Sequence, residues 1–213
     1  ELTSIDEDIV KSMADSGCRG SVFGLEHGVE DIRMNVLNKK ITNARYIEAT
    51  NWLKKHNLNF YINLVFCLPK ESLDDAIESL RFATQLKSKG IRVNILKMYK
   101  GTELASYANA NGLSDGIGEF TYKAKDFYGE FHRIANVTWA INLFQYFPFL
   151  LRWARTILSK KFGKVLGPIH LLSHWQDMLV CDLNLFYQGR SFGNGFWSRK
   201  TCFSRKTVRR DST

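Results

Sequence analysis

Hydrophobic and polar positions follow two different periods along the first hundred residues. Three segments have apolar side chains every three or four positions, as amphipathic helices do: residues 5–13, 42–56 and 72–89. Three shorter segments are mostly apolar and have the length of strands: residues 21–25, 60–68 and 91–96. Helices and strands that alternate in this order form parallel sheets with right-handed crossovers. The pattern therefore predicts an α/β fold.

Capping residues mark the ends of the predicted helices. The expected N-terminal caps have side chains that accept a hydrogen bond from the backbone: Ser4 or Asp6, Thr42, and Ser72. The expected stops are residues that tolerate a left-handed backbone: Gly17, Asn57 and Gly90. In the helix that follows Thr42, three apolar side chains are expected to face inward: Ile47, Trp52 and Leu53.

The middle strand has a pattern of its own. Residues 60–68 are apolar almost throughout, with Asn63 as the polar exception, and Pro69 ends the run. Such a run is typical of a strand that is covered on both faces in a parallel sheet. Three such strands make half of a barrel or a small open sheet, whose edges are exposed. We therefore expect a partial (βα) barrel of parallel strands, with a further segment upstream of it.

The alternation of helices and strands ends near residue 112. A short helix is expected at residues 103–110, and a glycine-rich loop at 115–118. Residues 127–158 are aromatic and helix-like, and Pro148 interrupts them. The chain is therefore divided into three parts: a partial barrel at residues 1–112, a mainly helical, basic and aromatic region at 113–198, and a disordered basic tail at 199–213.

Two stretches of the helical region bear on membrane contact. Residues 134–151 carry no charge and approach the length of a span, but polar residues and Pro148 interrupt them. A helical region that packs on the barrel is the favoured interpretation. Residues 152–164 are basic and amphipathic, which also fits a helix lying on a membrane surface.

Charge is divided unevenly between the two parts of the chain. Residues 1–120 carry 15 Lys and Arg against 16 Asp and Glu, a net charge of −1. Residues 121–213 carry 15 against 5, a net charge of +10, and the sum is the +9 of the whole chain. A basic, aromatic half is typical of proteins with an anionic partner, and peripheral membrane contact ranks above nucleic acid. A solvated face and a loose tail explain the same charges and are the alternative.

The four cysteines are far apart in the sequence: Cys18, Cys67, Cys181 and Cys202. No pair has the spacing of a zinc site or a redox motif, so reduced thiols and a cytoplasmic, in part membrane-associated, location are expected. The segment after Glu1 is polar, and no secretory leader is expected. His170 and His174 have the spacing of a metal-binding pair, but no Glu or Cys ligand is nearby, so no metal site is predicted.

A carboxylate flanked by glycines ends the first strand, in the segment Gly24-Leu25-Glu26-His27-Gly28. Ligands of parallel α/β proteins bind at the C-terminal ends of strands. Glu26 is therefore the first candidate for a binding residue, and an exposed carboxylate without a role is the alternative. His27 has no partner carboxylate at an informative spacing, so it is assigned no catalytic role.

Four sequence blocks follow one another in order along residues 1–112. They are Gly17-Cys18-Arg19 leading to Phe23-Gly24-Leu25-Glu26-His27-Gly28, then Val36-Leu37-Asn38-Lys39-Lys40-Ile41-Thr42, then Val65-Phe66-Cys67-Leu68-Pro69-Lys70-Glu71-Ser72, and then Tyr99-Lys100-Gly101-Thr102-Glu103-Leu104. Together they resemble the C-terminal half of the radical SAM core of the elongator-like type. That type includes methylthiotransferases, oxygen-independent coproporphyrinogen oxidases and cobalamin-binding radical SAM enzymes.

The resemblance implies a set of SAM-binding residues. It places Glu26 at the ribose hydroxyls or the amine of SAM, and Lys39 at the SAM carboxylate, where the family usually has arginine. Asn63 matches a polar residue near the ribose, and the backbone from Phe66 to Leu68 would line the adenine. The alternatives are that Lys39 is a solvated charge at a helix C-terminus and that Asn63 is a satisfied polar residue in the core.

The chain departs from the family pattern at four positions: His27, Cys67, Lys70 and Lys100, where the family has Ser, Gly, Gly and Pro. Cys67 and Lys70 are expected to narrow a loop that lets adenine approach the backbone. The cysteines also lack the C-x-x-x-C-x-x-C spacing with which the family holds a [4Fe–4S] cluster. We therefore predict no metal ligand in this chain, and no 5′-deoxyadenosyl radical from this chain alone.

The expected function is that of the SAM-binding half of a radical SAM enzyme whose catalytic residues and substrate stay unassigned. Its cofactors would be SAM, a [4Fe–4S] cluster in the full-length protein only, and cobalamin if the protein belongs to that branch. The alternative is a non-catalytic module whose basic C-terminal half binds an anionic membrane or a nucleic acid. A half-barrel enzyme without radical chemistry ranks third, because the four ordered blocks argue against it.

Overall fold

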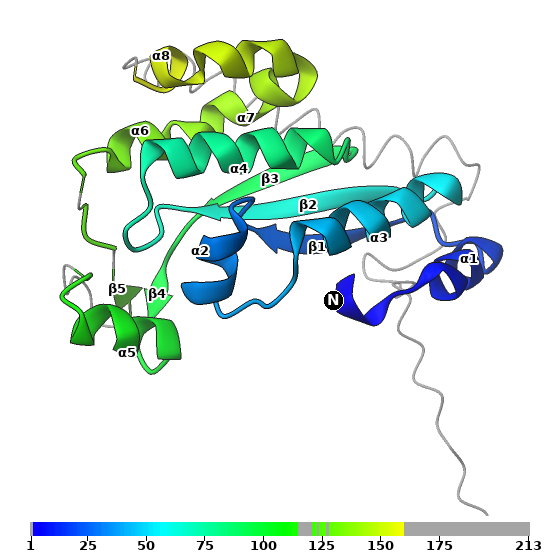
Figure 1. Cartoon of the computed structure of the whole chain (residues 1–213), viewed down its shortest axis with the longest axis horizontal. Helices are drawn as coiled ribbons and strands as arrows, with labels where there is room; N and C mark the ends of the chain where they lie inside the picture. Colours follow the sequence, from blue (N-terminus) through cyan, green and yellow to red (C-terminus); the bar gives the residue numbers. More distant parts are fainter. Residues whose placement is uncertain (1, 115–120, 123, 127, 160–213) are drawn as a thin grey trace, which may run out of the picture. The chain divides into compact units, whose positions relative to one another are not determined.

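A parallel sheet of three strands lies at the centre of the structure, a computed structural model (Figure 1). The strands are β1 (Gly20–Glu26), β2 (Asn59–Phe66) and β3 (Gly90–Ile95), and β2 lies between the other two. β2 runs parallel to both of its neighbours. The predicted α/β class is confirmed, with parallel strands that alternate with helices in a partial, barrel-like arrangement.

The structure describes residues 2–114, 121–122, 124–126 and 128–159. They lie in the first of the two units into which the chain divides, Glu1–Ser173 and His174–Thr213. The sequence predictions that fall outside the described residues concern the loop at 115–118, the end of the basic stretch at 160–164, the pair His170 and His174, Cys181 and Cys202, and the tail at 199–213.

Helices precede, connect and follow the strands. The elements up to β3 are η1 (Leu2–Ser4), α1 (Glu7–Asp15), α2 (Glu30–Asn35), α3 (Asn43–Lys55) and α4 (Leu73–Gln85). The elements after β3 are β4 (Met98–Tyr99), α5 (Glu103–Ala110), β5 (Thr121–Tyr122), α6 (Phe131–Ala135), α7 (Val137–Tyr146), η2 (Pro148–Trp153) and α8 (Ala154–Ser159). The described part after β3 is thus mainly helical, as predicted.

The predicted caps begin the three long helices. The side chain of Asp6 accepts a hydrogen bond from Ile9 N at 2.8 Å, so Asp6 rather than Ser4 caps α1. Thr42 caps α3 in the same way. Ser72 and Asp75 form a reciprocal capping box at the start of α4, an arrangement that satisfies two backbone donors at once.

Two of the three predicted stops are confirmed. Gly17 and Asn57 have φ angles of +82° and +56° and follow α1 and α3. The third prediction was wrong, because α4 ends at Gln85 and the left-handed residue is Lys87, with a φ of +55°. Gly90 instead begins β3, where a Cβ atom would lie 2.9 Å from the Tyr61 ring.

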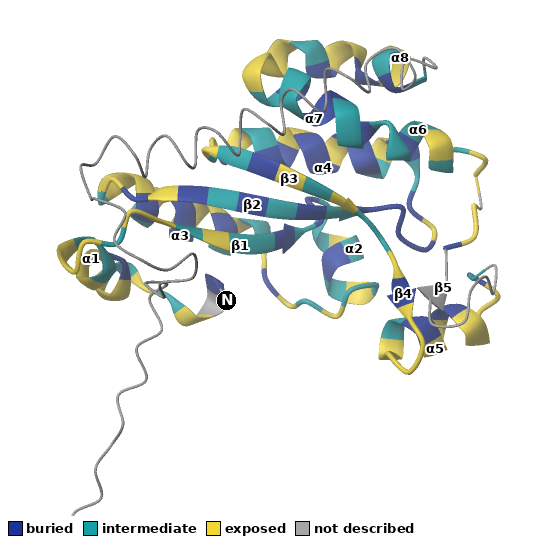
Figure 2. Ribbon diagram, turned by 180° about the vertical axis from the view of Figure 1, so that it is seen from behind, coloured by how far each residue is buried: buried dark blue, intermediate teal, exposed yellow. Residues whose placement is uncertain are grey.

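Among the described residues, helices cover one face of the middle strand, which corrects the prediction of two equally covered faces. Phe60, Ile62, Leu64 and Phe66 are buried, whereas the alternate residues of β2 are half-buried or exposed. Helices α3 and α4 lie on the buried face, and Figure 2 looks onto the other face, where no described helix covers the strands. Tyr61 and Val65 lie on the less buried face but are hydrophobic. The sequence of β2 is therefore almost continuously hydrophobic although its two faces are buried to different extents.

One hydrophobic core fills the space between the sheet and its helices (Figure 1, Figure 2). In α3, Leu53 is fully buried and Trp52 packs against the core, as predicted. Ile47 was predicted to face inward as well, but 36% of its surface is exposed.

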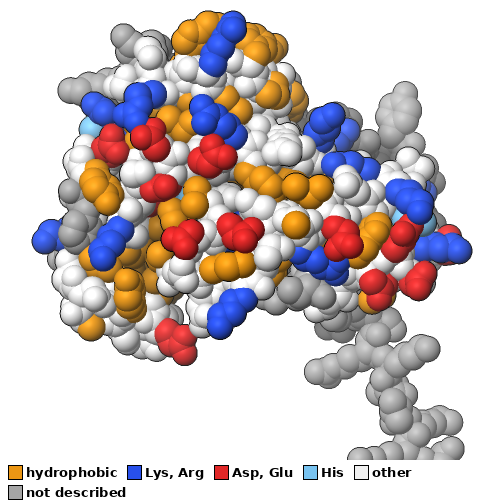
Figure 3. All heavy atoms as spheres, in the orientation of Figure 1, with side chains coloured by type: hydrophobic (Ala, Val, Ile, Leu, Met, Phe, Trp, Pro, Cys, Tyr) orange, Lys and Arg blue, Asp and Glu red, His pale blue; other side chains and the backbone are white. Residues whose placement is uncertain are grey.

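Helices α6, α7 and α8 form a layer next to α4 and β3 (Figure 1). Gln145 of α7 ties this layer to the sheet, since it accepts a hydrogen bond from Ile91 N and donates one to Lys89 O, both at 3.1 Å. Hydrophobic and basic side chains appear together on the outer surface of the layer (Figure 3). Among the described helices, none combines the length and the hydrophobicity that a membrane span requires.

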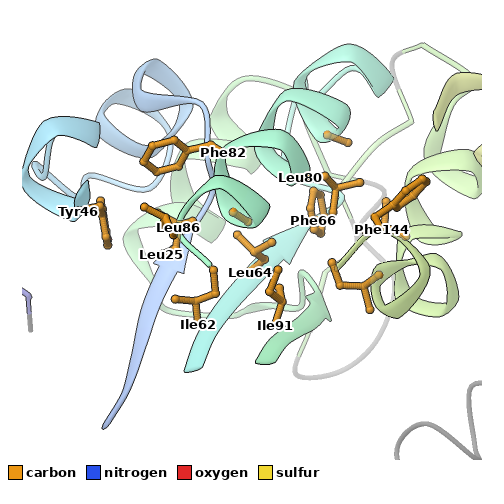
Figure 4. Packing of buried hydrophobic residues seen from close by; sticks show 14 of the residues in the cluster. Leu25, Tyr46, Ile62, Leu64, Phe66, Leu80, Phe82, Leu86, Ile91 and Phe144 are labelled. Atoms are coloured by element: carbon orange, nitrogen blue, oxygen red, sulfur yellow. The ribbon is translucent and has the colours of Figure 1, made fainter. Parts of the chain in front are cut away.

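The helical layer shares the core of the sheet (Figure 4). Its buried residues include Ile134, Val137, Phe144, Leu151 and Leu158. A second, smaller hydrophobic cluster joins α5 to the β4–β5 pair through Met98, Ala105, Ala108, Leu113 and Ala124. The boundary after residue 112 stays a prediction.

Candidate functional site

A bulge at the end of β1 turns Glu26 away from the core. Gly24 pairs with Asn63 of β2, and Glu26 already pairs with Leu64, so Leu25 is the extra residue. Leu25 is fully buried, and Glu26 has a φ angle of +64°. A bulge re-aims the side chains that follow it. Here it separates a core residue from a partly exposed carboxylate one position later.

Lys39 meets Glu26 at this strand end. The Lys39 ammonium lies 3.2 Å from Glu26 Oε1 and donates a hydrogen bond to the Gly24 carbonyl at 2.8 Å. The Tyr46 hydroxyl donates to the same carbonyl at 2.9 Å. Lys39 is therefore tied to the strand end, although its side chain comes from the loop after α2. Because 31% of the Glu26 side chain and 19% of the Lys39 side chain remain exposed, a ligand can reach both charges.

Gly24 leaves room for the Glu26 carboxylate. A Cβ atom at position 24 would lie 1.8 Å from Glu26 Oε1 and 3.2 Å from Lys39 Nζ. The two charged groups therefore fold over a backbone that has no side chain. A glycine at this position is a requirement of the ion pair rather than of the strand.

A cavity of about 600 Å³ adjoins the pair. Its lining residues come from the end of β1, the loop after α2 and the ends of β2 and β3: Glu26, Leu37, Asn38, Lys39, Lys40, Ile41, Val65 and Leu96. This volume is in the range of pockets that hold small-molecule ligands. The cavity thus lies at the C-terminal ends of parallel strands, where the sequence predicts a ligand.

Asn63 lies on the face of β2 that the described helices leave uncovered, directly beside Gly24. Its Oδ1 atom is buried and has no hydrogen-bond partner among the described residues. A buried acceptor without a partner is costly in a folded protein, and the role of Asn63 as a ligand contact stays a prediction. Asn63 does not line the cavity, but it pairs with Gly24 on the strand next to Glu26.

Phe66 and Leu68 lie deeper than the charged pair. The Phe66 side chain is fully buried and stands edge-on to the His27 ring, with centroids 5.9 Å apart. Its carbonyl accepts a hydrogen bond from Leu96 N, and Leu68 N donates one to Glu71 Oε2. The side chains of these two residues are buried, and backbone contact of residues 66–68 with a ligand stays a prediction.

His27 has a carboxylate partner that sequence spacing did not reveal. Its Nε2 atom lies 3.0 Å from Glu71 Oε1, and both side chains are fully buried. Val29 N donates a hydrogen bond to His27 Nδ1 at 3.2 Å, which assigns the imidazole proton to Nε2. The two residues are 44 positions apart, but each follows the end of one of two neighbouring strands. Only a prediction that β1 and β2 are parallel neighbours could have placed His27 and Glu71 next to each other.

Arg33 is a second buried charged residue that the sequence interpretation missed. Its guanidinium donates to the His27 carbonyl at 2.6 Å, to the Ile41 carbonyl at 2.8 and 2.9 Å, and to Asn43 Oδ1 at 2.6 Å. It also lies over the Tyr46 ring, 4.8 Å from the centroid. Burial lowers the pKa of Arg33 from its ordinary value. The side chain joins the end of β1 to the loop that carries Lys39.

Cys67 and Lys70, which stand where the related family has glycine, both have left-handed backbones. Their φ angles are +63° and +62°. Cys67 is buried in the core, where its Sγ atom lies 3.9 Å from the Phe131 carbonyl of α6, and burial raises its pKa well above the usual range. The Lys70 side chain is exposed. The expectation that they narrow a binding loop stays a prediction, and the Cys67 side chain is directed at α6.

The described residues do not fit an iron–sulfur cluster. No group of three or more His, Cys, Asp or Glu side chains among them is placed to hold a metal ion. Of the two described cysteines, Cys67 belongs to the core and Cys18 donates a hydrogen bond to the Gly20 carbonyl. Glu26 and Lys39 bring opposite charges to the edge of the cavity, an arrangement that fits a ligand with both an amine and a carboxylate.

Comparison with known proteins gives partial matches. No protein-family model matches the chain. The chain is 29% identical over 112 residues to a protein of Pyrococcus horikoshii that is named an uncharacterized methyltransferase. The match covers 53% of this chain but 24% of that protein. The chain thus spans about a quarter of the length of this distant relative.

Two solved structures are similar to the chain over part of its length. Coproporphyrinogen III oxidase from Escherichia coli, a radical SAM enzyme, has a TM-score of 0.44 and 12% identity, over 64% of this chain and 36% of the enzyme. The radical SAM methyltransferase TsrM from Kitasatospora setae, solved with cobalamin and a [4Fe–4S] cluster, has a TM-score of 0.48 and 12% identity, over 73% of this chain and 43% of the enzyme.

Proposed function

We propose that this chain is the SAM-binding part of a radical SAM enzyme. The observation that carries the proposal is the convergence of Glu26 and Lys39 beside a cavity at the C-terminal end of β1. A carboxylate and an ammonium held 3.2 Å apart match a ligand that has both an amine and a carboxylate. The methionine part of SAM is such a ligand.

The binding mode follows from the groups available. The SAM amine would take the place of the Lys39 ammonium at Glu26, and the SAM carboxylate would accept hydrogen bonds from Lys39. The free acceptor of Asn63 would bind a ribose hydroxyl. Val65 and Leu96 supply apolar surface for the adenine, next to the backbone from Phe66 to Leu68. Glu26 and Lys39 thus bind and orient the cofactor rather than transfer protons.

The reactive part of the cofactor chemistry would come from outside this sequence. The relative from Pyrococcus horikoshii is about four times as long as the matched segment, which leaves room for a cluster-binding segment in a protein of that kind. Its name supports methyl transfer as the reaction class. When bound, SAM would supply the methyl or the deoxyadenosyl group. Cobalamin would be a further cofactor only if the longer protein is a cobalamin-binding radical SAM enzyme.

Calorimetric titration of SAM into the 213-residue chain tests the proposal. We expect Glu26→Gln and Lys39→Met each to weaken SAM binding by about tenfold or more, because each removes a charge-assisted hydrogen bond. The matched controls are Glu7→Gln and Lys55→Met, which remove an ion pair on the surface of α1 and α3. These controls should leave SAM affinity unchanged.

Two results would contradict the proposal. The first is an affinity for SAM that the Glu26 and Lys39 variants share with the controls, in proteins whose circular dichroism shows them to be folded. The second concerns the longer protein: if its anaerobic preparation contains neither iron nor sulfide, and its sequence has no C-x-x-x-C-x-x-C motif, then the radical SAM assignment is wrong even where SAM binds.

A further inference from the structure

Four large aromatic side chains are exposed within eight consecutive residues at the end of α7 and along η2. They are Tyr146, Phe147, Phe149 and Trp153, with exposed fractions of 67, 50, 59 and 45%. Together with Arg152 they form what we call the aromatic–basic surface. In Figure 3 a hydrophobic area with a basic side chain on it lies at the top of the molecule, over the region of η2 and α8 in Figure 1.

The aromatic–basic surface is held in place by the opposite side of the same segment. Phe144, Leu151, Ala154 and Leu158 are buried in the main core. η2 contacts α4, α7 and α8. The exposed rings therefore do not belong to a loose segment. An amphipathic segment with one face fixed in the core presents aromatic residues on its other face.

The sequence that contains this surface is rich in basic residues. From residue 131 to residue 176 the sequence has no Asp or Glu, and it has six basic residues: Arg133, Arg152, Arg155, Lys160, Lys161 and Lys164. The Arg152 guanidinium lies 3.8 Å from the Trp153 ring centroid, a cation–π contact that keeps its charge at the surface. Arg155 is engaged elsewhere, since it pairs with Asp74 of α4.

We propose that the aromatic–basic surface binds the headgroup region of an anionic lipid bilayer. Aromatic rings are favoured at the level of lipid headgroups, and basic side chains beside them are attracted to lipid phosphates. In this arrangement Phe147 and Phe149 enter the interface, and Arg152 remains at the phosphates. The protein would lie on the membrane rather than span it.

The chemistry of the surface favours lipid over nucleic acid. Single-stranded nucleic acids bind where aromatic faces accept stacked bases along a basic groove. Phe147 and Phe149 instead pack edge to face on each other, with centroids 6.1 Å apart at 77°. The described surface also carries four aromatic rings beside a single arginine that has no carboxylate partner there. Four rings that can be buried in an interface, beside one arginine at the phosphates, match a bilayer surface better than a strand that presents a phosphate at every nucleotide.

Vesicle co-sedimentation of the full chain tests the proposal. The probes are vesicles of phosphatidylcholine alone, and vesicles of phosphatidylcholine with phosphatidylserine. We expect binding to the vesicles with phosphatidylserine, weakened by salt as charge-driven binding must be. The double variant Phe147→Ser/Phe149→Ser should lower the partition coefficient by about tenfold or more, because both rings lose their burial in the interface.

The control variant is Tyr107→Ser, which removes an aromatic ring on α5 with a similar exposed fraction of 44%. It should bind vesicles as the unchanged chain does. Phe149→Trp should also retain binding, and thermal melting of each variant shows whether it is folded. SAM titration of the double variant should be unaffected, so this proposal and the proposed function are tested separately.

Three results would overturn the proposal. The first is equal binding of the chain to the two vesicle types. The second is equal vesicle binding by the folded double variant and the unchanged chain. The third is binding of a single-stranded RNA oligonucleotide that exceeds vesicle binding and is lost in the double variant.

Discussion

Two neighbouring residues at the end of β1 belong to regions of opposite character. Glu26 is partly exposed and pairs with Lys39 beside a cavity. His27 is fully buried and pairs with Glu71, and Arg33 reaches the His27 carbonyl from beneath. The bulge at Leu25 and the left-handed Glu26 make this division possible within three residues. The segment therefore holds a ligand-binding group on one side and the interaction that fixes its position on the other.

Buried interactions next to Glu26 can fix the positions of Glu26 and Lys39 although both side chains are partly exposed. Glu71 connects the loop after β2 to His27, and Arg33 connects the loop before α3 to the same strand end. The cavity is lined by Glu26 at this strand end and by the loop before α3. Buried hydrogen bonds behind a binding group restrict its position more than a solvated ion pair does. The buried region is thus expected to determine stability, and the exposed region affinity.

Arg33→Met should have the largest effect on stability. It removes donors from the carbonyls of His27 and Ile41 inside the protein, which leaves buried acceptors without partners. We expect the free energy of unfolding to fall by about 3–5 kcal/mol, as for other broken buried interactions of charged groups. Urea unfolding followed by circular dichroism measures it.

The control for this prediction is Arg81→Met. Arg81 is exposed and pairs only with Glu78 one turn away, so its loss should cost less than about 0.5 kcal/mol. Equal losses of stability in the two variants would show that burial of Arg33 contributes nothing.

Gly28→Ala should lower the free energy of unfolding, because the added methyl group would clash with α4 next to the buried pair of His27 and Glu71. A Cβ atom at position 28 would lie 2.6 Å from Ser79 Cα and 2.7 Å from the Ser79 carbonyl oxygen, and backbone atoms cannot move aside. Gly28 N also donates a hydrogen bond to Ser79 Oγ at 2.8 Å. Separation of α4 from the strand end should cost about 1–3 kcal/mol, the range for overpacked cores, measured by urea unfolding.

Gly24→Ala is the matched change on the exposed side. Its Cβ atom would meet the Glu26 carboxylate, which is the end of a flexible side chain and can turn away. We expect a loss of stability below about 1 kcal/mol together with SAM binding weakened by about tenfold. If Gly24→Ala unfolds the protein as readily as Gly28→Ala, then the division between the two regions is wrong.

Lys70→Gly should have the smallest effect and the opposite sign. Lys70 has a φ of +62° in the loop that carries Glu71 to His27. Glycine adopts this conformation without strain, so we expect a gain of about 0.5–1 kcal/mol in the free energy of unfolding. Lys40→Gly, at a position without a positive φ, should instead lose stability because glycine adds entropy to the unfolded chain.

Local rules predicted much of the fold. Asp6, Thr42 and Ser72 begin helices because their side chains satisfy backbone donors, and this depends on sequence alone. The left-handed Lys87 was missed because nothing in a lysine marks that conformation. The open face of β2 was missed because Tyr61 and Val65 count as hydrophobic whichever face they line.

The sequence predicted those residues of the site that lie within short motifs, but not the contacts between distant segments. Glu26 lies at a strand end, as expected. Its contact with Lys39 was not predicted, and the roles of both residues in SAM binding remain to be tested. The partnership of His27 with Glu71 depends on the pairing of β1 with β2, and no spacing in the sequence contains it. Arg33 was missed for a similar reason, since an arginine in a short helix is usually solvated.

The outer edge of β1 has a consequence for handling the protein. Among the described strands, β1 pairs only with β2. On its far side the Gly24 carbonyl accepts hydrogen bonds from Lys39 and Tyr46, and the Gly20 carbonyl accepts one from Cys18. The rest of that edge can accept a strand from a second copy of the chain, the usual route to edge-to-edge aggregation. Purification at high concentration is thus expected to yield oligomers. A lysine in place of Val22, which is 54% exposed, is the change that should keep the protein monomeric.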